Sequence, residues 1–104
     1  MNQIKTIGVI GAGQMGGGIA QVAAVAGLRA LVFDSFPAAL GRCQDNHNKR
    51  MAREVEKGRM TQDQMAAAQS HLHYVGALDE LKGVDIVIEA VVEDAKTKRE
   101  LFAF

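Results

Sequence analysis

Two kinds of hydrophobic pattern alternate along this chain. Short apolar runs rich in β-branched residues predict strands that are buried in a parallel sheet, at residues 5–10, 29–34, 72–75 and 84–91. Between these runs, apolar residues recur every three or four positions and predict helices. Strands that alternate with helices are typical of an α/β fold with right-handed crossovers. We therefore expect a parallel sheet with helices on both faces.

The first predicted helix runs from Gln14 to Ala26, and Gly27 follows it where a C-terminal cap glycine would lie. Gly17 and Gly18 are unusual inside a helix, where each costs roughly 1 kcal/mol relative to alanine. We expect them to allow close packing, and the alternative is a turn that is wider than the minimal motif. The apolar positions at helical spacing are Met15, Ile19, Val22 and Ala26.

A pair of antiparallel helices is expected between the second and third strands. Ser35 and Pro37 predict the start of the first of these helices, and Gly58 predicts its end. The residues from Thr61 to Gln64 form the pattern of a capping box, which opens the second helix. A further helix is expected after Glu93. One apolar stripe follows the first helix of the pair, formed by Leu40, Cys43, His47, Met51 and Val55.

The composition is that of an ordinary globular domain. The 104 residues are 48% hydrophobic and 23% charged, with 12 basic and 12 acidic side chains, so the total charge favours neither a nucleic acid nor a membrane as partner. The charge is uneven, since residues 35–60 carry six basic and three acidic side chains. No apolar stretch is long enough to cross a bilayer.

Cys43 is the only cysteine, which rules out an internal disulfide, and no group of cysteines and histidines has the spacing of a zinc site. A reducing compartment is therefore expected, and we expect the protein to be cytoplasmic. His47 lies on the apolar stripe and is expected to pack in the core. Neither His71 nor His73 follows a strand in a way that predicts catalysis.

The sequence from Gly11 to Gly16 is a G-x-G-x-x-G motif between a predicted strand and a predicted helix. The first glycine permits a tight turn, the second lets the backbone approach a pyrophosphate, and the third lets the helix pack closely on the strand. The phosphates would then contact free N–H groups at the positive end of the helix. This pattern predicts a Rossmann-type sheet with the strand order 3-2-1-4. It also predicts a dinucleotide site, whose residues are Gly11, Ala12, Gly13, Gln14, Met15 and Gly16.

Asp34 ends the second strand, 18 residues after Gly16. At this position a carboxylate accepts hydrogen bonds from the ribose hydroxyls of the adenosine. A carboxylate also repels a 2′-phosphate, and no arginine follows closely, so NAD is favoured over NADP as the cofactor. The alternative is that Asp34 only caps the turn that follows it.

The glycine motif and its continuation, Gly17-Gly18-Ile19-Ala20-Gln21, resemble those of the 3-hydroxyacyl-CoA dehydrogenase family. A second match is the segment from Asp85 to Asp94, and the helix pair with Lys57-Gly58 at its tip is similar too. The resemblance spans the chain. It implies that Ala90 and Val91 line the nicotinamide side of the NAD site, and that Glu93 and Lys98 approach its ribose end.

The resemblance also implies that basic residues after the second strand face the coenzyme A moiety of an acyl-CoA substrate. The candidates are Arg50 and Lys57, which are expected on the side of their helix away from the apolar stripe. For Glu93 and Lys98, an exposed salt bridge is the alternative to a role in cofactor binding. Exposed charges on a helix are commonly only solvated, and this alternative stays open for Arg50 and Lys57.

Residues 1–104 are thus expected to form the N-terminal part of an NAD-binding Rossmann domain. The family's catalytic histidine, glutamate, serine and asparagine would come from segments after Phe104, as would a helical dimerisation domain, so the chain alone is expected to be inactive. The implied parent is a homodimer that interconverts L-3-hydroxyacyl-CoA and 3-oxoacyl-CoA with NAD. A dehydrogenase of the hydroxyisobutyrate or gulonate type and a non-catalytic nucleotide-sensing module remain alternatives.

Overall fold

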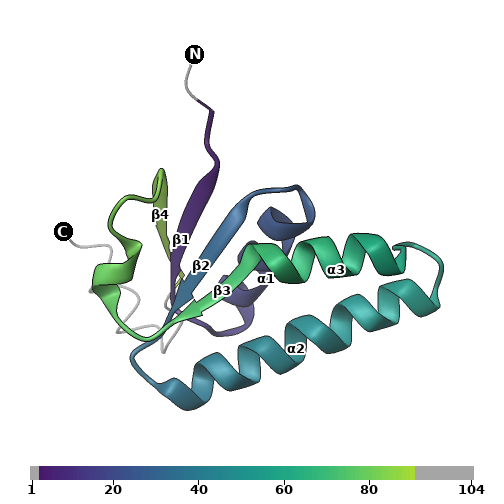
Figure 1. The fold of residues 1–104 in the computed structure, drawn as a ribbon. Coiled ribbons are helices and arrows are strands. Elements are labelled where there is room, and N and C mark those ends of the chain that lie inside the picture. The colour runs from purple at the N-terminus through teal and green to yellow at the C-terminus, as the bar shows by residue number, and fades with distance from the viewer. Residues whose placement is uncertain (1–2, 91–104) are drawn as a thin grey trace.

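The computed structural model describes residues 3–90. These residues contain one sheet of four parallel strands in the order β3-β2-β1-β4, with helices packed against it (Figure 1). This order confirms the prediction. The predicted helix after Glu93 lies outside the described residues. The last strand is shorter in the described part than the predicted run of residues 84–91. The strands are β1 (Thr6–Ile10), β2 (Arg29–Phe33), β3 (Leu72–Val75) and β4 (Ile86–Glu89).

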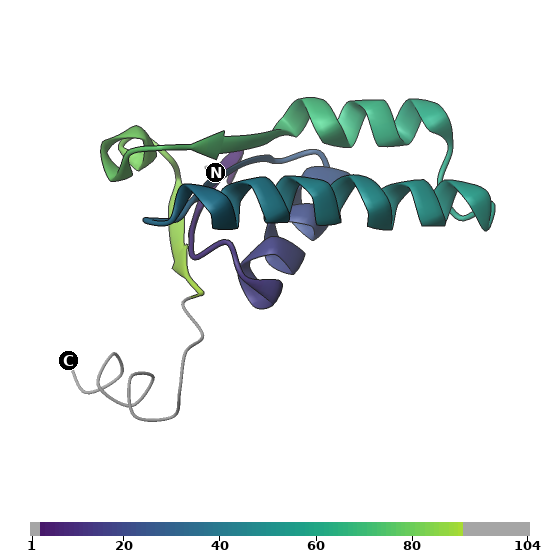
Figure 2. The ribbon, with the colours of Figure 1, turned by 90° about the horizontal axis from the view of Figure 1, so that it is seen from below.

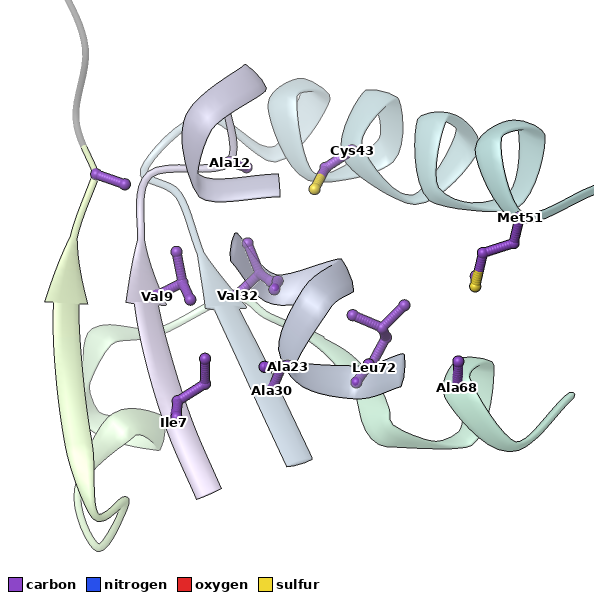
Figure 3. Packing of buried hydrophobic residues seen from close by; sticks show 13 residues of the cluster. Ile7, Val9, Ala12, Ala23, Ala30, Val32, Cys43, Met51, Ala68 and Leu72 are labelled. Carbon is purple, nitrogen blue, oxygen red and sulfur yellow. The ribbon is translucent and has the colours of Figure 1, made fainter. Parts of the chain in front are cut away.

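The central strand β1 is covered on both faces. Ile7 and Val9 point to one face and are almost fully buried, beside Ala30 and Val32 of β2 (Figure 3). Gly8 faces the opposite side, where a Cβ atom would lie 3.1 Å from a methyl group of Leu81. The helix α1 (Gln14–Val25) therefore covers one face, and the short 3₁₀ helix η1 (Leu78–Leu81) packs on the other.

The helix α1 has the predicted bounds within one residue, but the predicted apolar face was wrong. Met15 and Val22 are exposed, at 48% and 71% of their surface, and Ala26 is exposed as well. The buried residues are small, because the backbone of α1 lies too close to the sheet for longer side chains. These residues are Gly16, Gly17, Ala20, Ala23 and Ala24.

The helices α2 (Pro37–Glu56) and α3 (Gln62–His71) form the predicted antiparallel pair, which extends beyond the sheet (Figures 1 and 2). Of the predicted stripe, Cys43, His47 and Met51 are buried, and Met51 points toward Ala68 of α3 (Figure 3). None of the helices within residues 3–90 combines the length and hydrophobicity that a membrane span needs.

The ends of the helix pair follow the predicted signals with one exception. Gly58 ends α2 with a φ of +74°, and the capping box at Thr61 is present, with Thr61 Oγ1 accepting from Gln64 N at 3.0 Å. The predicted cap at Ser35 was wrong. Phe36 precedes the helix without a side-chain cap, and Asp34 instead accepts the hydrogen bond from Phe36 N.

Asp85 joins the start of β1 to the chain that enters β4. Its Oδ2 atom accepts hydrogen bonds from the backbone N–H groups of Lys5 and Thr6, at 2.8 and 2.9 Å. These two hydrogen bonds favour the ionised carboxylate and lower the pKa of Asp85. The side chain thus fixes the register of the edge strand against the centre of the sheet.

We expect Asp85→Ala to reduce the free energy of unfolding at pH 7, because two backbone N–H groups lose their acceptor. Since folding lowers the pKa of Asp85, its contribution is fully present above the pKa of the unfolded carboxyl and is lost as the pH falls through the folded pKa. Urea denaturation at pH 7 and pH 3 measures this. The difference between variant and wild type should shrink at pH 3, and an equal difference at both values would contradict the assigned role.

Candidate functional site

The carboxyl ends of β1, β2 and β4 meet at one edge of the sheet. Gly11 follows β1 and donates its N–H to Phe33 O at 2.8 Å, while Ala90 follows β4 and donates its N–H to Ile10 O at 2.8 Å. Asp34 directly follows β2. Three predicted site positions that are far apart in the sequence thus lie together at the edge where open α/β sheets bind their ligands.

The three glycines of the turn have separate structural reasons. Gly11 has a φ of +109°, a backbone conformation that residues with a Cβ atom rarely adopt. At Gly16 a Cβ atom would lie only 1.9 Å from the carbonyl oxygen of Gly11, so no larger residue fits. At Gly13 a Cβ atom would meet nothing within 4 Å. Gly13 is therefore not needed for packing, and its surface is open to a ligand.

The N-terminus of α1 is uncapped. Gly13 precedes the helix without a side-chain hydrogen bond, and the first turn contains no acidic residue. The first N–H groups of a helix have no acceptor within the helix, and they lie at the positive end of its dipole. Gly13, Gln14 and Met15 are exposed. The start of α1 therefore offers hydrogen-bond donors and a positive field to an anion, in the manner of a phosphate site.

Asp34 holds the glycine turn in place with its side chain. Its Oδ2 atom accepts from Ala12 N at 2.9 Å, and its Oδ1 atom accepts from Phe36 N at 2.9 Å. The bond to Phe36 N is the cap of the following turn that the sequence left as an alternative, and the bond to Ala12 N is an additional contact with the glycine turn. Each carboxylate oxygen accepts up to two hydrogen bonds, so both keep capacity for a ligand hydroxyl.

Arg50 lies closer to the glycine turn than the sequence suggested. It lines a narrow cavity between the turn and α2 together with Gly13, Gln14 and Asn46. Its predicted location, away from the apolar stripe, was wrong, because Cys43 and His47 of that stripe line the same cavity. Lys57 follows the end of α2, about 10 Å further along the helix at 1.5 Å per residue, and is exposed.

A buried polar connection beside the turn was not foreseen. His47 was expected only to pack, and it is fully buried, but its ring also bonds to Gly17 O and to the hydroxyl of Tyr74, each at 2.6 Å. Burial lowers the pKa of His47 and raises the pKa values of Cys43 and Tyr74. The polar atoms of His47 and Tyr74 were visible in the sequence, but their partners become neighbours only in the fold.

The predicted packing role of the two extra glycines is confirmed for one of them. A Cβ atom on Gly17 would lie 3.3 Å from Cys43 Sγ, whereas one on Gly18 would meet nothing within 4 Å. Gly17 therefore allows α2 to approach α1, and the packing prediction for Gly18 was wrong.

Three further predicted site residues lie outside the described residues, namely Val91, Glu93 and Lys98.

Comparison with known proteins gives a consistent result. The family model described as "3-hydroxyacyl-CoA dehydrogenase, NAD binding domain" matches residues 6–104. A probable 3-hydroxybutyryl-CoA dehydrogenase of Bacillus subtilis is 40% identical over 100 residues, which are 96% of this chain and 35% of that protein. A fatty acid oxidation complex subunit alpha of Idiomarina loihiensis is 40% identical over 101 residues, which are 97% of this chain and 14% of that protein.

Solved structures agree with these sequence matches. The crystal structure of (S)-3-hydroxybutyryl-CoA dehydrogenase from Ralstonia eutropha superposes with a TM-score of 0.86 at 35% identity, and the match covers 96% of this chain and 35% of that one. The chain thus spans about a third of the length of such relatives. Among the families that the sequence left open, the match favours the 3-hydroxyacyl-CoA dehydrogenases.

Gly16 and Gly13 should respond differently to substitution by alanine. Gly16→Ala should lower the free energy of unfolding by about 1–3 kcal/mol, because its Cβ atom meets a backbone oxygen that cannot move aside cheaply. Gly13→Ala should leave it unchanged or raise it by up to about 1 kcal/mol, since the backbone there has a φ of −72° and the space is open. Denaturant unfolding of both variants measures the difference, and equal effects would refute the described packing.

Proposed function

This chain belongs to the 3-hydroxyacyl-CoA dehydrogenase family, and we propose that it binds NAD at the turn between β1 and α1. The observation that carries the proposal is the exposed, uncapped start of α1, with Asp34 beside it at the same edge of the sheet. A dinucleotide carries a pyrophosphate and a ribose diol at a spacing that these two features fit.

In this proposal, the pyrophosphate contacts the backbone of the turn formed by Gly11, Ala12, Gly13, Gln14, Met15 and Gly16. The open surface at Gly13 supports close approach of the phosphates. Asp34 accepts hydrogen bonds from the adenosine ribose hydroxyls while it keeps its bonds to Ala12 N and Phe36 N. Its negative charge selects NAD over NADP.

The nicotinamide end of the cofactor is proposed to lie toward the end of β4. Ala90 is buried, and its backbone N–H donates a hydrogen bond to Ile10 O. Both observations support a role for Ala90 as part of the wall of the site. The roles proposed for Val91, Glu93 and Lys98 rest on the family resemblance alone.

For the whole protein, we propose the interconversion of L-3-hydroxyacyl-CoA and 3-oxoacyl-CoA. NAD supplies the hydride acceptor, or NADH the donor, and the catalytic side chains come from the remaining two thirds of the relatives' length. Residues 1–104 are then the N-terminal part of the NAD-binding domain, without activity by themselves. A homodimeric assembly and a cytoplasmic location are part of the same proposal.

Arg50 and Lys57 are proposed to face the coenzyme A moiety of the acyl-CoA. The exposure of Lys57 at the tip of the helix pair fits a contact with a substrate that reaches beyond the sheet. Arg50 lines a cavity beside Gly13, so its charge also acts on the phosphates of the cofactor.

We expect Gly13→Val to abolish measurable NAD binding while the chain stays folded, because the branched side chain fills the space through which the phosphates approach. Calorimetric titration with NAD gives the affinity, and circular dichroism verifies the fold. Gly18→Ala is the matched control, since that position has equal space but lies one turn into the helix. Unchanged affinity in folded Gly13→Val would remove the turn from the site.

Asp34→Asn should shift the preference between the two dinucleotides. Asparagine keeps one oxygen for Ala12 N but removes the charge that opposes a 2′-phosphate. We expect the ratio of the NADP to the NAD dissociation constant to fall about tenfold, which corresponds to about 1.4 kcal/mol. Titration of the wild type and of Asp34→Asn with NAD and with NADP gives this ratio for each protein. If the two proteins have the same ratio, the carboxylate serves only the turn.

A further inference from the structure

The helix α2 packs closely against α1 at Gly17. Because Gly17 has no side chain, Cys43 and His47 of α2 reach its backbone, and a Cβ atom there would lie 3.3 Å from Cys43 Sγ and 3.7 Å from His47 Nε2. At this separation the carbonyl oxygen of Gly17 lies within hydrogen-bond distance of a side chain on the neighbouring helix.

The hydrogen bonds of His47 determine which of its nitrogens carries the proton. Gly17 O can only accept, so His47 Nε2 donates to it at 2.6 Å. In the neutral ring, Nδ1 then accepts, and the hydroxyl of Tyr74 donates to it at 2.6 Å. Cys43 Sγ lies 3.9 Å from both ring nitrogens and favours neither. Burial lowers the pKa of His47 and favours the neutral ring; the hydrogen bond to Gly17 O opposes this effect, and the nearby Arg50 adds to it.

The acceptor of this bond occupies a special position in α1. Gly17 is the residue whose N–H closes the first turn of the helix, through a hydrogen bond to Gly13 O at 2.8 Å. The peptide groups between Gly13 and Gly17 carry the free N–H groups that face the proposed pyrophosphate. The hydrogen bond that His47 donates to Gly17 O from the neighbouring helix therefore restrains the orientation of those N–H groups.

We propose that His47 is a positioning residue for dinucleotide binding. It holds the first turn of α1 against α2 in the orientation that the phosphates require, and Tyr74 on β3 donates to Nδ1, the ring nitrogen that this tautomer leaves free to accept. This inference rests on the proposed function. It adds a residue to the site that neither the glycine motif nor Asp34 accounts for, and it links three elements, α1, α2 and β3, at one fully buried side chain.

Packing alone does not require a histidine here. The neighbours of His47 along the stripe, Cys43 and Met51, are buried and apolar, and an aliphatic side chain of similar volume would fill the same space. A buried polar group gives up its hydration, so the net gain from its hydrogen bonds is small. Replacing His47 alone leaves the hydroxyl of Tyr74 without its partner, which lowers the stability of the fold, so the test needs a control for that loss. What leucine cannot supply at this position is a donor to Gly17 O.

The test compares three variants in the full chain. His47→Leu removes the donor, and His47→Gln restores one, since the Nε2 of glutamine extends about as far from the backbone as that of histidine. Met51→Ala, one turn further along α2, is the control for a destabilised core, because it removes most of a fully buried side chain. Each is titrated with NAD at a temperature where it is folded, and amide hydrogen exchange is followed at Gly17 without NAD.

We expect His47→Leu to raise the NAD dissociation constant about tenfold and to speed exchange at Gly17. His47→Gln should recover most of the affinity, and Met51→Ala should bind as the wild type does. If His47→Leu binds NAD normally, or if Met51→Ala loses as much affinity, the positioning role is wrong. If the wild type does not bind NAD at all, the proposed function fails and this inference with it, whereas normal wild-type binding isolates the question of His47.

Tyr74→Phe tests the second half of the proposal. The ¹⁵N chemical shifts of the His47 ring should show a single Nε2–H tautomer in the wild type and also in Tyr74→Phe, because Gly17 O still requires a donor. Tyr74→Phe should lose less NAD affinity than His47→Leu does. A ring protonated at Nδ1 in either protein would overturn the assigned donor, and a loss of affinity in Tyr74→Phe as large as in His47→Leu would contradict the role of the bond to Gly17 O.

Discussion

The contact between the first turn of α1 and the backbone of Gly11 is the constraint on which the site depends. Only 1.9 Å would separate a Cβ atom at position 16 from the carbonyl oxygen of Gly11, so the helix starts directly against the end of β1. This closeness places the free N–H groups of the helix at the edge of the sheet. It also requires small residues on the buried face of α1, which explains why Met15 and Val22 are left exposed.

Side chains from other elements hold this turn from both sides. Asp34, at the end of β2, accepts the N–H of Ala12 before the helix begins, and His47, from α2, donates to the carbonyl of Gly17 one turn later. The two groups have opposite hydrogen-bonding roles, as the direction of the peptide groups demands, since N–H groups precede carbonyls along the axis. In the proposed NAD site, the same carboxylate would also bind the ribose, so the shape of the glycine turn and the choice of cofactor would depend on one residue.

The sequence predicted those parts of the fold that depend on the backbone. The glycine turn, the end of α2 at Gly58 and the capping box at Thr61 follow from local conformational rules, which a sequence displays directly. The strand order follows from the Rossmann-type fold that the glycine motif predicts. The buried face of α1 and the location of Arg50 were mispredicted, because both depend on how closely two elements approach. That distance was set by glycines whose effect on packing the hydrophobic pattern does not reveal.

The same reasoning explains why the hydrogen bonds of His47 could not be foreseen. A histidine on an apolar stripe is compatible with simple packing, and its second partner, Tyr74, is 27 residues away on another element. Only Gly17 brings the backbone of α1 within reach, and a glycine in a helix has several explanations. The buried polar atoms must nevertheless be paired, since each unpaired one would cost about 1–3 kcal/mol. The pairing therefore connects α2 and β3 to the glycine turn, so that a displacement of His47 acts directly on the start of α1.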